Sequence, residues 1–241
     1  MKLSSWNFWQ NLRLENQQFA VIGLGRFGRA VCETLHNLGY EVLAIDREEK
    51  MVHQALTDKI SSHAFKLDST EINAIKQVGI LDFNTVIVAI GNYLAESITT
   101  TLNLKELGIK SVVAKASSQT HKKLLEKVGA DYVVFPEMEM GCEVARLLTK
   151  PKVIDQFDID PEHSIVEIIV PDKFDGKTIA NLEVRNKYGL NLLAVSTEDE
   201  KFIINPKPNT VLTKGKTIIV LGSNKDINLS LIHISEPTRR S

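Results

Sequence analysis

Short apolar runs alternate with amphipathic stretches over residues 18–135. The amphipathic stretches, such as RAVCETLHNLG and LAESITTTLNLKELG, have the spacing of helices, and Gly108 is placed to end the second one. The apolar runs are rich in Val, Ile and Ala, which is typical of strands buried on both faces of a parallel sheet; they are FAVIGLG, EVLAID, SSHAFKLD, TVIVAIG, SVVAKA and DYVVFP. Six strands separated by helices predict a doubly wound, parallel α/β sheet.

A different pattern follows this region. PEMEMGCEVARLLTKP predicts a helix over 136–149 that ends before Pro151. After it come four predicted strands and one helical stretch, TIANLEVRNKYG; the strands are SIVEIIVP, NLLAVST, KFIINP and KTIIVLGS. Strands that follow one another this directly indicate a second, small α+β domain from about 160 to 225, with the boundary near KPKVIDQFDIDPEH.

Both ends of the chain lie outside these domains. We divide the chain into an extension (1–17), a first domain (18–150), a second domain (151–227) and a tail (228–241). In the extension, Trp6 and Trp9 lie three residues apart, as on one helix face. That face would pack on its own domain, on a sister subunit, on a membrane protein or at the bilayer interface. The tail, LSLIHISEPTRRS after Asn228, is similar to translated sequencing-adapter read-through, so we interpret it as non-native and assign it no function.

Composition narrows the class of protein. The 241 residues carry a net charge of -1, which argues against a nucleic-acid partner, because neutralising phosphates requires a basic surface. The two cysteines, Cys32 and Cys142, lack CxxC spacing, so neither a disulfide framework nor a structural zinc site is expected, and a reducing cytosol fits. No apolar run approaches the roughly 20 residues that span a bilayer. The start of the chain lacks the apolar region of a secretory signal.

The stretch VIGLGRFG carries a G-x-G-x-x-G spacing in the context that gives it meaning, after a strand and at the start of a helix predicted over 26–38. Gly23 allows the tight turn, Gly25 the close approach of a phosphate, and Gly28 the packing of the helix on the sheet. Asp46 ends the second strand, where a carboxylate accepts hydrogen bonds from ribose hydroxyls. The sequence therefore predicts a nucleotide site.

Residues near the other strand ends extend this site, because open α/β sheets bind ligands at the carboxyl ends of their strands. The Asp46 carboxylate disfavours a ligand with a 2'-phosphate, because two negative groups would meet there. The positive charge of Arg47 offsets this repulsion in part. Asp68 and Ser69 either contact adenine or cap the next helix. Glu137 either bridges Na⁺ or Mg²⁺ to the phosphates or stabilises the first turn of its helix. The full set of predicted cofactor-binding residues is Gly23, Gly25, Arg26, Phe27, Gly28, Asp46, Arg47, Asp68, Ser69, Ala89, Ile90, Gly91, Asn92, Lys115 and Glu137.

Catalytic patterns are missing. No GxSxG, Walker A lysine motif or HExxH occurs. The histidines are interpreted as surface or satisfied residues; they are His36, His53, His63, His121 and His163, with His233 in the tail. A nucleotide site with little evident chemistry predicts a sensor rather than an enzyme.

These stretches resemble the RCK (regulator of K⁺ conductance) family, specifically the cytosolic subunit of Ktr/Trk-type potassium uptake systems. The resemblance covers about 18–225 and rests on QFAVIGLGRFG, EVLAID, VIVAIG, TTTLNLKELGI, KLLEKVGAD, PEMEMG, SIVEI and VRNKYG. It implies a Rossmann-like RCK domain followed by an RCK-C domain, in a homo-octameric ring docked under a membrane channel dimer. It also implies that ATP and ADP compete for the glycine-loop site and change the conformation of the ring, so that the channel opens with ATP.

The resemblance assigns roles to particular residues. Arg26 would meet the γ-phosphate, and Glu137 would match the cation-binding glutamate at a dimer contact. Some relatives bind cyclic di-AMP between two RCK-C domains; here Arg185 would be the phosphate partner, with apolar walls from Ile179, Leu182, Tyr188 and Pro206. Arg185 is equally read as a surface cation, and relatives with this fold need not bind the dinucleotide. Two other functions stay open: an NAD(H)-responsive regulator of the same fold and a small NAD-dependent oxidoreductase.

Overall fold

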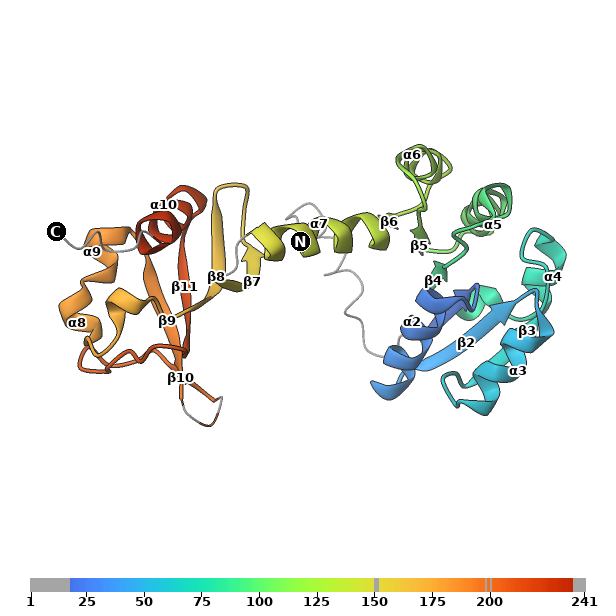
Figure 1. Cartoon of the computed structure of the whole chain (residues 1–241). Coiled ribbons are helices and arrows are strands. Elements are labelled where there is room, and N and C mark those ends of the chain that lie inside the picture. The colour runs from blue at the N-terminus through green and yellow to red at the C-terminus, as the bar shows by residue number, and fades with distance from the viewer. Residues whose placement is uncertain (1–17, 150–151, 198, 200, 236–241) are drawn as a thin grey trace. The chain divides into compact units, whose positions relative to one another are not determined.

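The computed structural model of the chain describes residues 18–149, 152–197, 199 and 201–235 (Figure 1). Contacts divide the chain into two compact units, and the division falls at Gly141, inside a helix. The predicted tail is described only as far as residue 235, and the predicted extension (1–17) with its two tryptophans lies outside the described residues. Across the part of the chain that is described, no helix is both long enough and apolar enough to cross a bilayer.

The first unit contains a six-stranded parallel sheet, as the alternating pattern predicts. The strand order is β3-β2-β1-β4-β5-β6, which is the doubly wound, Rossmann-like order. The strands are β1 (Gln18–Ile22), β2 (Glu41–Asp46), β3 (His63–Lys66), β4 (Thr85–Val88), β5 (Ser111–Lys115) and β6 (Tyr132–Val134). The predicted fold class is therefore confirmed for this unit.

Helices connect these strands. They are α2 (Arg26–Asn37), α3 (Glu49–Thr57), α4 (Ile72–Gln77), the 3₁₀ turn η2 (Ile80–Asp82), α5 (Leu94–Glu106), α6 (Gln119–Lys127) and α7 (Pro136–Thr149). The bounds of α7 agree with the sequence prediction, whereas α2 ends one residue earlier than predicted. Gly108, with φ at +82°, follows the C-cap of α5 and ends that helix as predicted.

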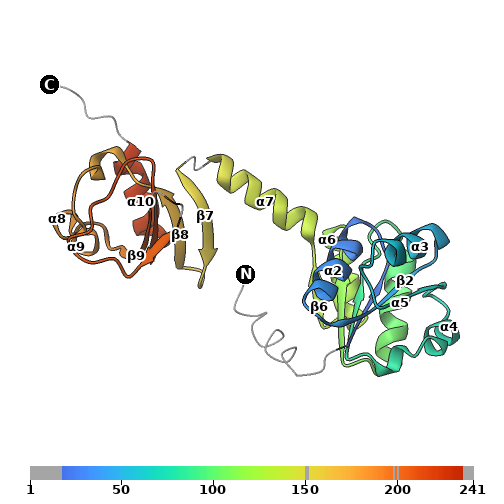
Figure 2. The same ribbon diagram turned by 90° about the horizontal axis from the view of Figure 1, so that it is seen from below.

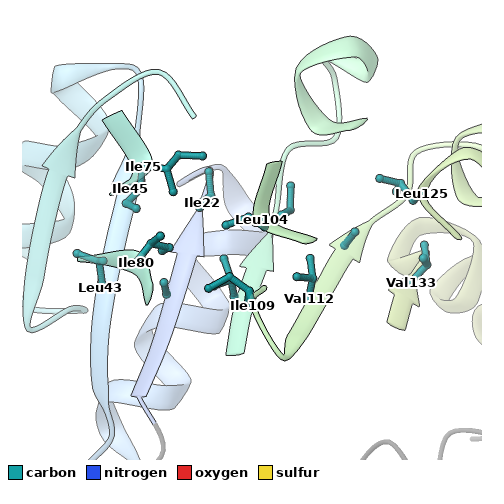
Figure 3. Packing of buried hydrophobic residues seen from close by; sticks show 14 of the residues in the cluster. Ile22, Leu43, Ile45, Ile75, Ile80, Leu104, Ile109, Val112, Leu125 and Val133 are labelled. Atoms are coloured by element: carbon teal, nitrogen blue, oxygen red, sulfur yellow. The ribbon is translucent and has the colours of Figure 1, made fainter. Parts of the chain in front are cut away.

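The sheet is covered on both faces (Figure 2). Successive residues of β1 belong to different apolar clusters, because side chains alternate across a strand: Ile22 lies in one cluster and Val21 in the other. The cluster around Ile22 is completed by buried residues of α4, η2, α5 and α6, such as Leu104 and Leu125 (Figure 3). The cluster around Val21 is completed by residues of α2 and α3 such as Cys32. This double burial explains the continuous apolar runs of the sequence.

The second unit contains a five-stranded antiparallel sheet of order β10-β9-β11-β8-β7. Its strands are β7 (Val153–Asp158), β8 (His163–Ile169), β9 (Asn191–Ser196), β10 (Phe202–Ile204) and β11 (Thr217–Ser223). One apolar cluster joins this sheet to its helices, which are η3 (Asp172–Phe174), α8 (Ile179–Leu182), α9 (Val184–Tyr188) and α10 (Asn224–Ser235). The predicted α+β class is confirmed here too.

Three features of this unit differ from the sequence prediction. Strand β7 lies in the segment interpreted as a domain boundary; it is an edge strand that pairs only with β8, and it carries polar residues. The single predicted helix in TIANLEVRNKYG is two short helices, because Glu183 between them has φ at +45°. Helix α10 follows the last strand, where the sequence predicted none, and extends into the predicted tail. Its start is fixed by Ser223, whose Oγ accepts a hydrogen bond from the Asp226 N–H.

Candidate nucleotide-binding site

A cavity of about 730 Å³ lies in the first unit. Residues at the carboxyl ends of β1, β2, β4 and β5 line it, which is where a doubly wound sheet binds ligands. Of the fifteen predicted cofactor-binding residues, all except Gly28 line this cavity. These fourteen residues therefore lie together around one cavity, although their binding roles stay predictions.

The three glycines of the motif have different physical roles. Gly23 has φ at +98°, which favours glycine, and its N–H donates to the Ile45 carbonyl at 2.7 Å. Gly28 lies under the turn, because a Cβ there would stand 1.9 Å from the Gly23 carbonyl oxygen. Gly25 is the N-cap of α2 and lines the cavity, and a Cβ there would meet nothing within 4 Å. Open space and unpaired N–H groups at a helix start suit an anion.

Asp46 fastens the glycine turn to the end of β2. Its Oδ2 accepts the Leu24 N–H at 2.6 Å, and its Oδ1 accepts the Glu48 N–H at 2.9 Å. Each carboxylate oxygen has two lone pairs, so two hydrogen bonds leave acceptor capacity for ribose hydroxyls. The carboxylate thus holds a fixed position beside the cavity.

Asp68 and Ser69 have partners of their own in the loop after β3. Asp68 Oδ1 accepts the Thr70 hydroxyl at 2.7 Å and the Thr70 N–H at 2.9 Å. The hydroxyl bond, followed by the backbone bond, lowers the pKa of this carboxyl from its ordinary value. Ser69 shares a buried hydrogen bond of 2.8 Å with Thr100 of α5. The N-cap of α4 is Glu71, so neither predicted residue caps that helix.

The cations Lys115 and Arg26 both line the cavity, and Lys115 forms an ion pair with Glu137. Lys115 Nζ, at the end of β5, lies 2.7 Å from Glu137 Oε1 in the first turn of α7. The Lys115 side chain is only 14% exposed and its Nζ lies 5.6 Å from the centre of the Phe27 ring. Its hydrogen bond is the main reason that the pKa of Glu137 is lowered, and the charge of Arg26 adds a smaller effect.

Arg26 differs from Lys115 in having no ion-pair partner within the described ranges of the chain. Its side chain is exposed at the start of α2 and lines the cavity. Among the described residues it makes neither an ion pair nor a side-chain hydrogen bond. The guanidinium is therefore free to bind a ligand.

The loop after β4 closes the cavity from the middle of the sheet. The Ala89 N–H donates to the Ile22 carbonyl at 2.7 Å, which extends the pairing of β4 with β1 into the site. A Cβ at Gly91 would stand 3.3 Å from Lys115 Nζ, so the glycine lets the lysine lie close to this loop. Ile90 and Asn92 line the cavity on either side of Gly91.

Sequence reasoning missed several lining residues: Ile22, Glu48, Met51, Leu67, Tyr93, Glu96, Pro136 and Met140. Most are neighbours of predicted residues at the same strand ends. Tyr93 is the most informative, because the Arg47 guanidinium carbon lies 4.0 Å from the centre of its ring. These two residues are far apart in the sequence, and no local pattern indicates their contact.

The residues predicted to bind a second ligand lie in the other unit. Leu182 is buried in the apolar core there, and Ile179 and Tyr188 pack against the same cluster. Arg185 is exposed on α9, and Pro206 is partly buried after β10. Three of the five thus have a packing role, and a role in binding cyclic di-AMP stays a prediction.

The histidines fit the prediction only in part. His163 is exposed and lies 3.0 Å from Asp160. His121, by contrast, is 0% exposed; its Nδ1 lies 3.3 Å from the Ser117 N–H, while its Nε2 has no hydrogen-bond partner among the described residues. Within the described ranges, no group of three or more His, Cys, Asp or Glu side chains is arranged to hold a metal ion.

Both units match known protein families. The TrkA-N domain matches residues 19–136, and the TrkA-C domain matches residues 164–229. The Ktr system potassium uptake protein A of Bacillus subtilis (strain 168) is 41% identical over 215 residues, which cover 89% of this chain and 96% of that protein. The Ktr system potassium uptake protein C of the same organism is also 41% identical, over 88% of this chain and 95% of that protein.

Solved structures agree on the fold. The crystal structure of the GsuK RCK domain covers 92% of this chain and 47% of its own chain, with a TM-score of 0.54 and 24% identity. The GsuK channel bound to NAD gives a TM-score of 0.52 at the same identity, over 92% of this chain and 39% of its own. The glycine turn with Asp46, the two domain matches and the near full-length identity lead to one conclusion: the chain belongs to the RCK family of K⁺ transport regulators, with the TrkA-N and TrkA-C domains of the Ktr system potassium uptake proteins.

Proposed function

We propose that this chain is a non-enzymatic, nucleotide-sensing regulatory subunit of a K⁺ uptake system. It would act in the cytoplasm, at the inner face of the membrane, through a membrane subunit of the Ktr/Trk type. The observation that carries the proposal is the cavity at the glycine turn, which combines a helix N-terminus, the anchored carboxylate of Asp46 and two cations. Two relatives that are 41% identical support the proposal, because both are named Ktr system potassium uptake proteins.

The proposed switch is the exchange of ATP for ADP. An effector shifts an equilibrium only through a contact that differs between two states. The third phosphate of ATP would supply that contact by meeting Arg26, whose forked guanidinium suits phosphate oxygens. ADP would occupy the same turn without reaching Arg26.

A cation at the phosphates would involve Glu137. Among the described residues no group of three or more metal-ligating side chains includes Glu137, so Mg²⁺ or Na⁺ would need phosphate oxygens and water to complete its shell. Lys115, paired with Glu137 Oε1 at 2.7 Å, already balances the charge of this carboxylate and would repel a second cation until phosphates supply negative charge. We therefore propose that the cation binds with the nucleotide and not before it.

Two parts of the proposal come from the family resemblance. One is assembly into a homo-octameric ring. The other is binding of cyclic di-AMP by the second domain, with Arg185 as the phosphate partner. Both belong to an assembly of several copies, and the exchange of ATP for ADP would change the conformation of the ring.

A regulator that responds to NAD(H) is the second candidate, and the solved GsuK channel bound to NAD has the same fold. Asp46 and Glu48, two residues later, line the cavity and disfavour NADP⁺, since its 2'-phosphate would meet negative charge. A small NAD-dependent oxidoreductase is the third and weakest reading.

Titration of the purified chain with ATP, ADP, NADH and NADP⁺ separates these readings. The proposal predicts micromolar binding of ATP and ADP, in competition with each other, and no binding of NADH. Binding of NADH alone would support the NAD(H)-responsive regulator. Substrate-dependent oxidation of NADH would overturn the proposal in favour of an enzyme.

A further inference from the structure

Arg47 and Tyr93, which both line the cavity, are in contact with each other. Arg47 follows β2, and Tyr93 is the N-cap of α5 after β4, so the two residues come from loops on neighbouring parts of the same sheet edge. The guanidinium carbon lies 4.0 Å from the centre of the Tyr93 ring. Both residues line the cavity, and the Arg47 side chain remains 45% exposed.

The charge of Arg47 is already balanced by acidic neighbours. Its Nη1 lies 3.9 Å from Glu96 Oε1, and its Nε lies 3.6 Å from Glu48 Oε1. An arginine that clamps a 2'-phosphate needs a free positive charge, and here two carboxylates compete with such a phosphate. What the arginine does offer is a flat, weakly hydrated guanidinium that lies over the Tyr93 ring and remains partly exposed.

The position of this contact follows from the rest of the site. Asp46, the ribose-binding candidate, immediately precedes Arg47 and is fixed by the Leu24 and Glu48 N–H groups. Phosphates placed at the glycine turn and ribose placed at Asp46 direct the base away from the turn, toward the loops that follow β2 and β3. The apolar side chains of Met51 and Leu67 line the same cavity there.

We propose that Arg47, held from behind by the Tyr93 ring, is the stacking platform that selects a purine base at this site. The purine would lie on the open face of the guanidinium, giving a stack of base, guanidinium and tyrosine ring. A two-ring purine covers a flat cation more fully than a one-ring pyrimidine does. This inference rests on the proposed nucleotide binding and adds base selectivity to it.

The test compares ADP with UDP, which share ribose and diphosphate and differ in the base. Calorimetric titration of the wild-type chain should give tighter binding of ADP, by about tenfold for one stacked base. Arg47→Gln and Tyr93→Leu should each weaken ADP several-fold and leave UDP nearly unchanged. Tyr93→Phe keeps the ring and should retain the preference. Lys50→Gln, which removes an exposed cation from α3 outside the cavity, is the matched control for charge.

Other outcomes would overturn the inference in distinguishable ways. Equal losses of ADP and UDP in Arg47→Gln would make Arg47 a general attractor of anions. A larger loss of NADP⁺ than of ADP would make it a 2'-phosphate clamp. If both variants keep the preference for ADP over UDP, Arg47 and Tyr93 do not form a stacking platform, and the proposed function is unaffected. A wild-type chain that binds no nucleotide would overturn both.

Discussion

The two cations that line the cavity near the glycine turn, Lys115 and Arg26, differ in burial and in their partners. Lys115 is largely buried and is paired with Glu137 at 2.7 Å, so its charge is already balanced by a carboxylate of the same chain. Arg26 is exposed, lines the same cavity and has no ion-pair partner among the described residues. A phosphate that reaches Arg26 therefore gains a charge-assisted contact without breaking an existing one.

Arg26→Ala should reduce the affinity for ATP about tenfold and leave ADP binding nearly unchanged, because a hydrogen bond to a charged group contributes roughly 1.5–3 kcal/mol. Arg26→Lys should recover only part of the ATP affinity, since the ammonium lacks the fork. Competition titrations of both nucleotides measure the ratio, with Lys50→Ala as the control for charge. Equal losses for ATP and ADP would assign Arg26 to the stability of the turn.

His121 should make the stability of the first unit depend on pH. Burial lowers the pKa of this imidazole below its ordinary value of 6.5. The unfolded chain therefore takes up the proton near pH 6.5, and the folded chain only at lower pH. The free energy of unfolding should then fall as the pH drops from 6.5 toward the folded-state pKa.

Urea unfolding between about pH 7.5 and pH 5 tests this dependence. His121→Asn keeps an acceptor for the Ser117 N–H and cannot take up a proton in this range. The variant should be less stable at neutral pH and should lose less stability on acidification than the wild type does. The same decrease in both proteins would show that other groups control the dependence.

The glycine turn and helix α2 form the part of the cavity where we propose that the phosphates bind. Gly28 allows α2 to lie directly on the turn, whereas Gly25 leaves the space at the helix N-terminus open. These two glycines should respond differently to the same substitution, which separates packing from ligand access.

Gly28→Ala should destabilise the first unit by about 1–3 kcal/mol or more, because the added Cβ would meet backbone at 1.9 Å. Gly25→Ala should leave the free energy of unfolding within about 0.5 kcal/mol of the wild type but weaken ATP and ADP alike, since its Cβ would fill the space that a phosphate needs. Urea unfolding and nucleotide titration of both variants provide the measurements. Unaltered nucleotide affinity in a folded Gly25→Ala would show that phosphate does not approach this glycine.

Local sequence patterns predicted most of the elements and most of the site. The strands of the first sheet are buried on both faces, so their apolar runs are unambiguous, and the glycines and Asp46 occur at fixed offsets from them. Strand β7 was missed because an edge strand can carry polar residues. The break at Glu183 was missed because a positive φ there depends on tertiary packing. The contact of Tyr93 with Arg47 was missed because it joins two loops distant in sequence.

At the scale of the whole molecule, α7 is the segment of the chain between the proposed nucleotide site and the second unit. Pro136 and Glu137, in the first turn of α7, line the cavity. The division between the two units falls at Gly141, within the same helix. In our account, the phosphates change the contacts of Lys115 and Glu137, and therefore act at the first turn of the helix that leads into the second unit.

K⁺ flux measured with this chain and a Ktr-type membrane subunit, reconstituted together in liposomes, tests the central claim most directly. The account predicts faster flux with ATP than with ADP, and loss of that difference in Arg26→Ala at saturating concentrations of both nucleotides. Liposomes with the membrane subunit alone provide the control and should not respond to either nucleotide. Equal flux with ATP and ADP, at concentrations where both are shown to bind, would contradict the account.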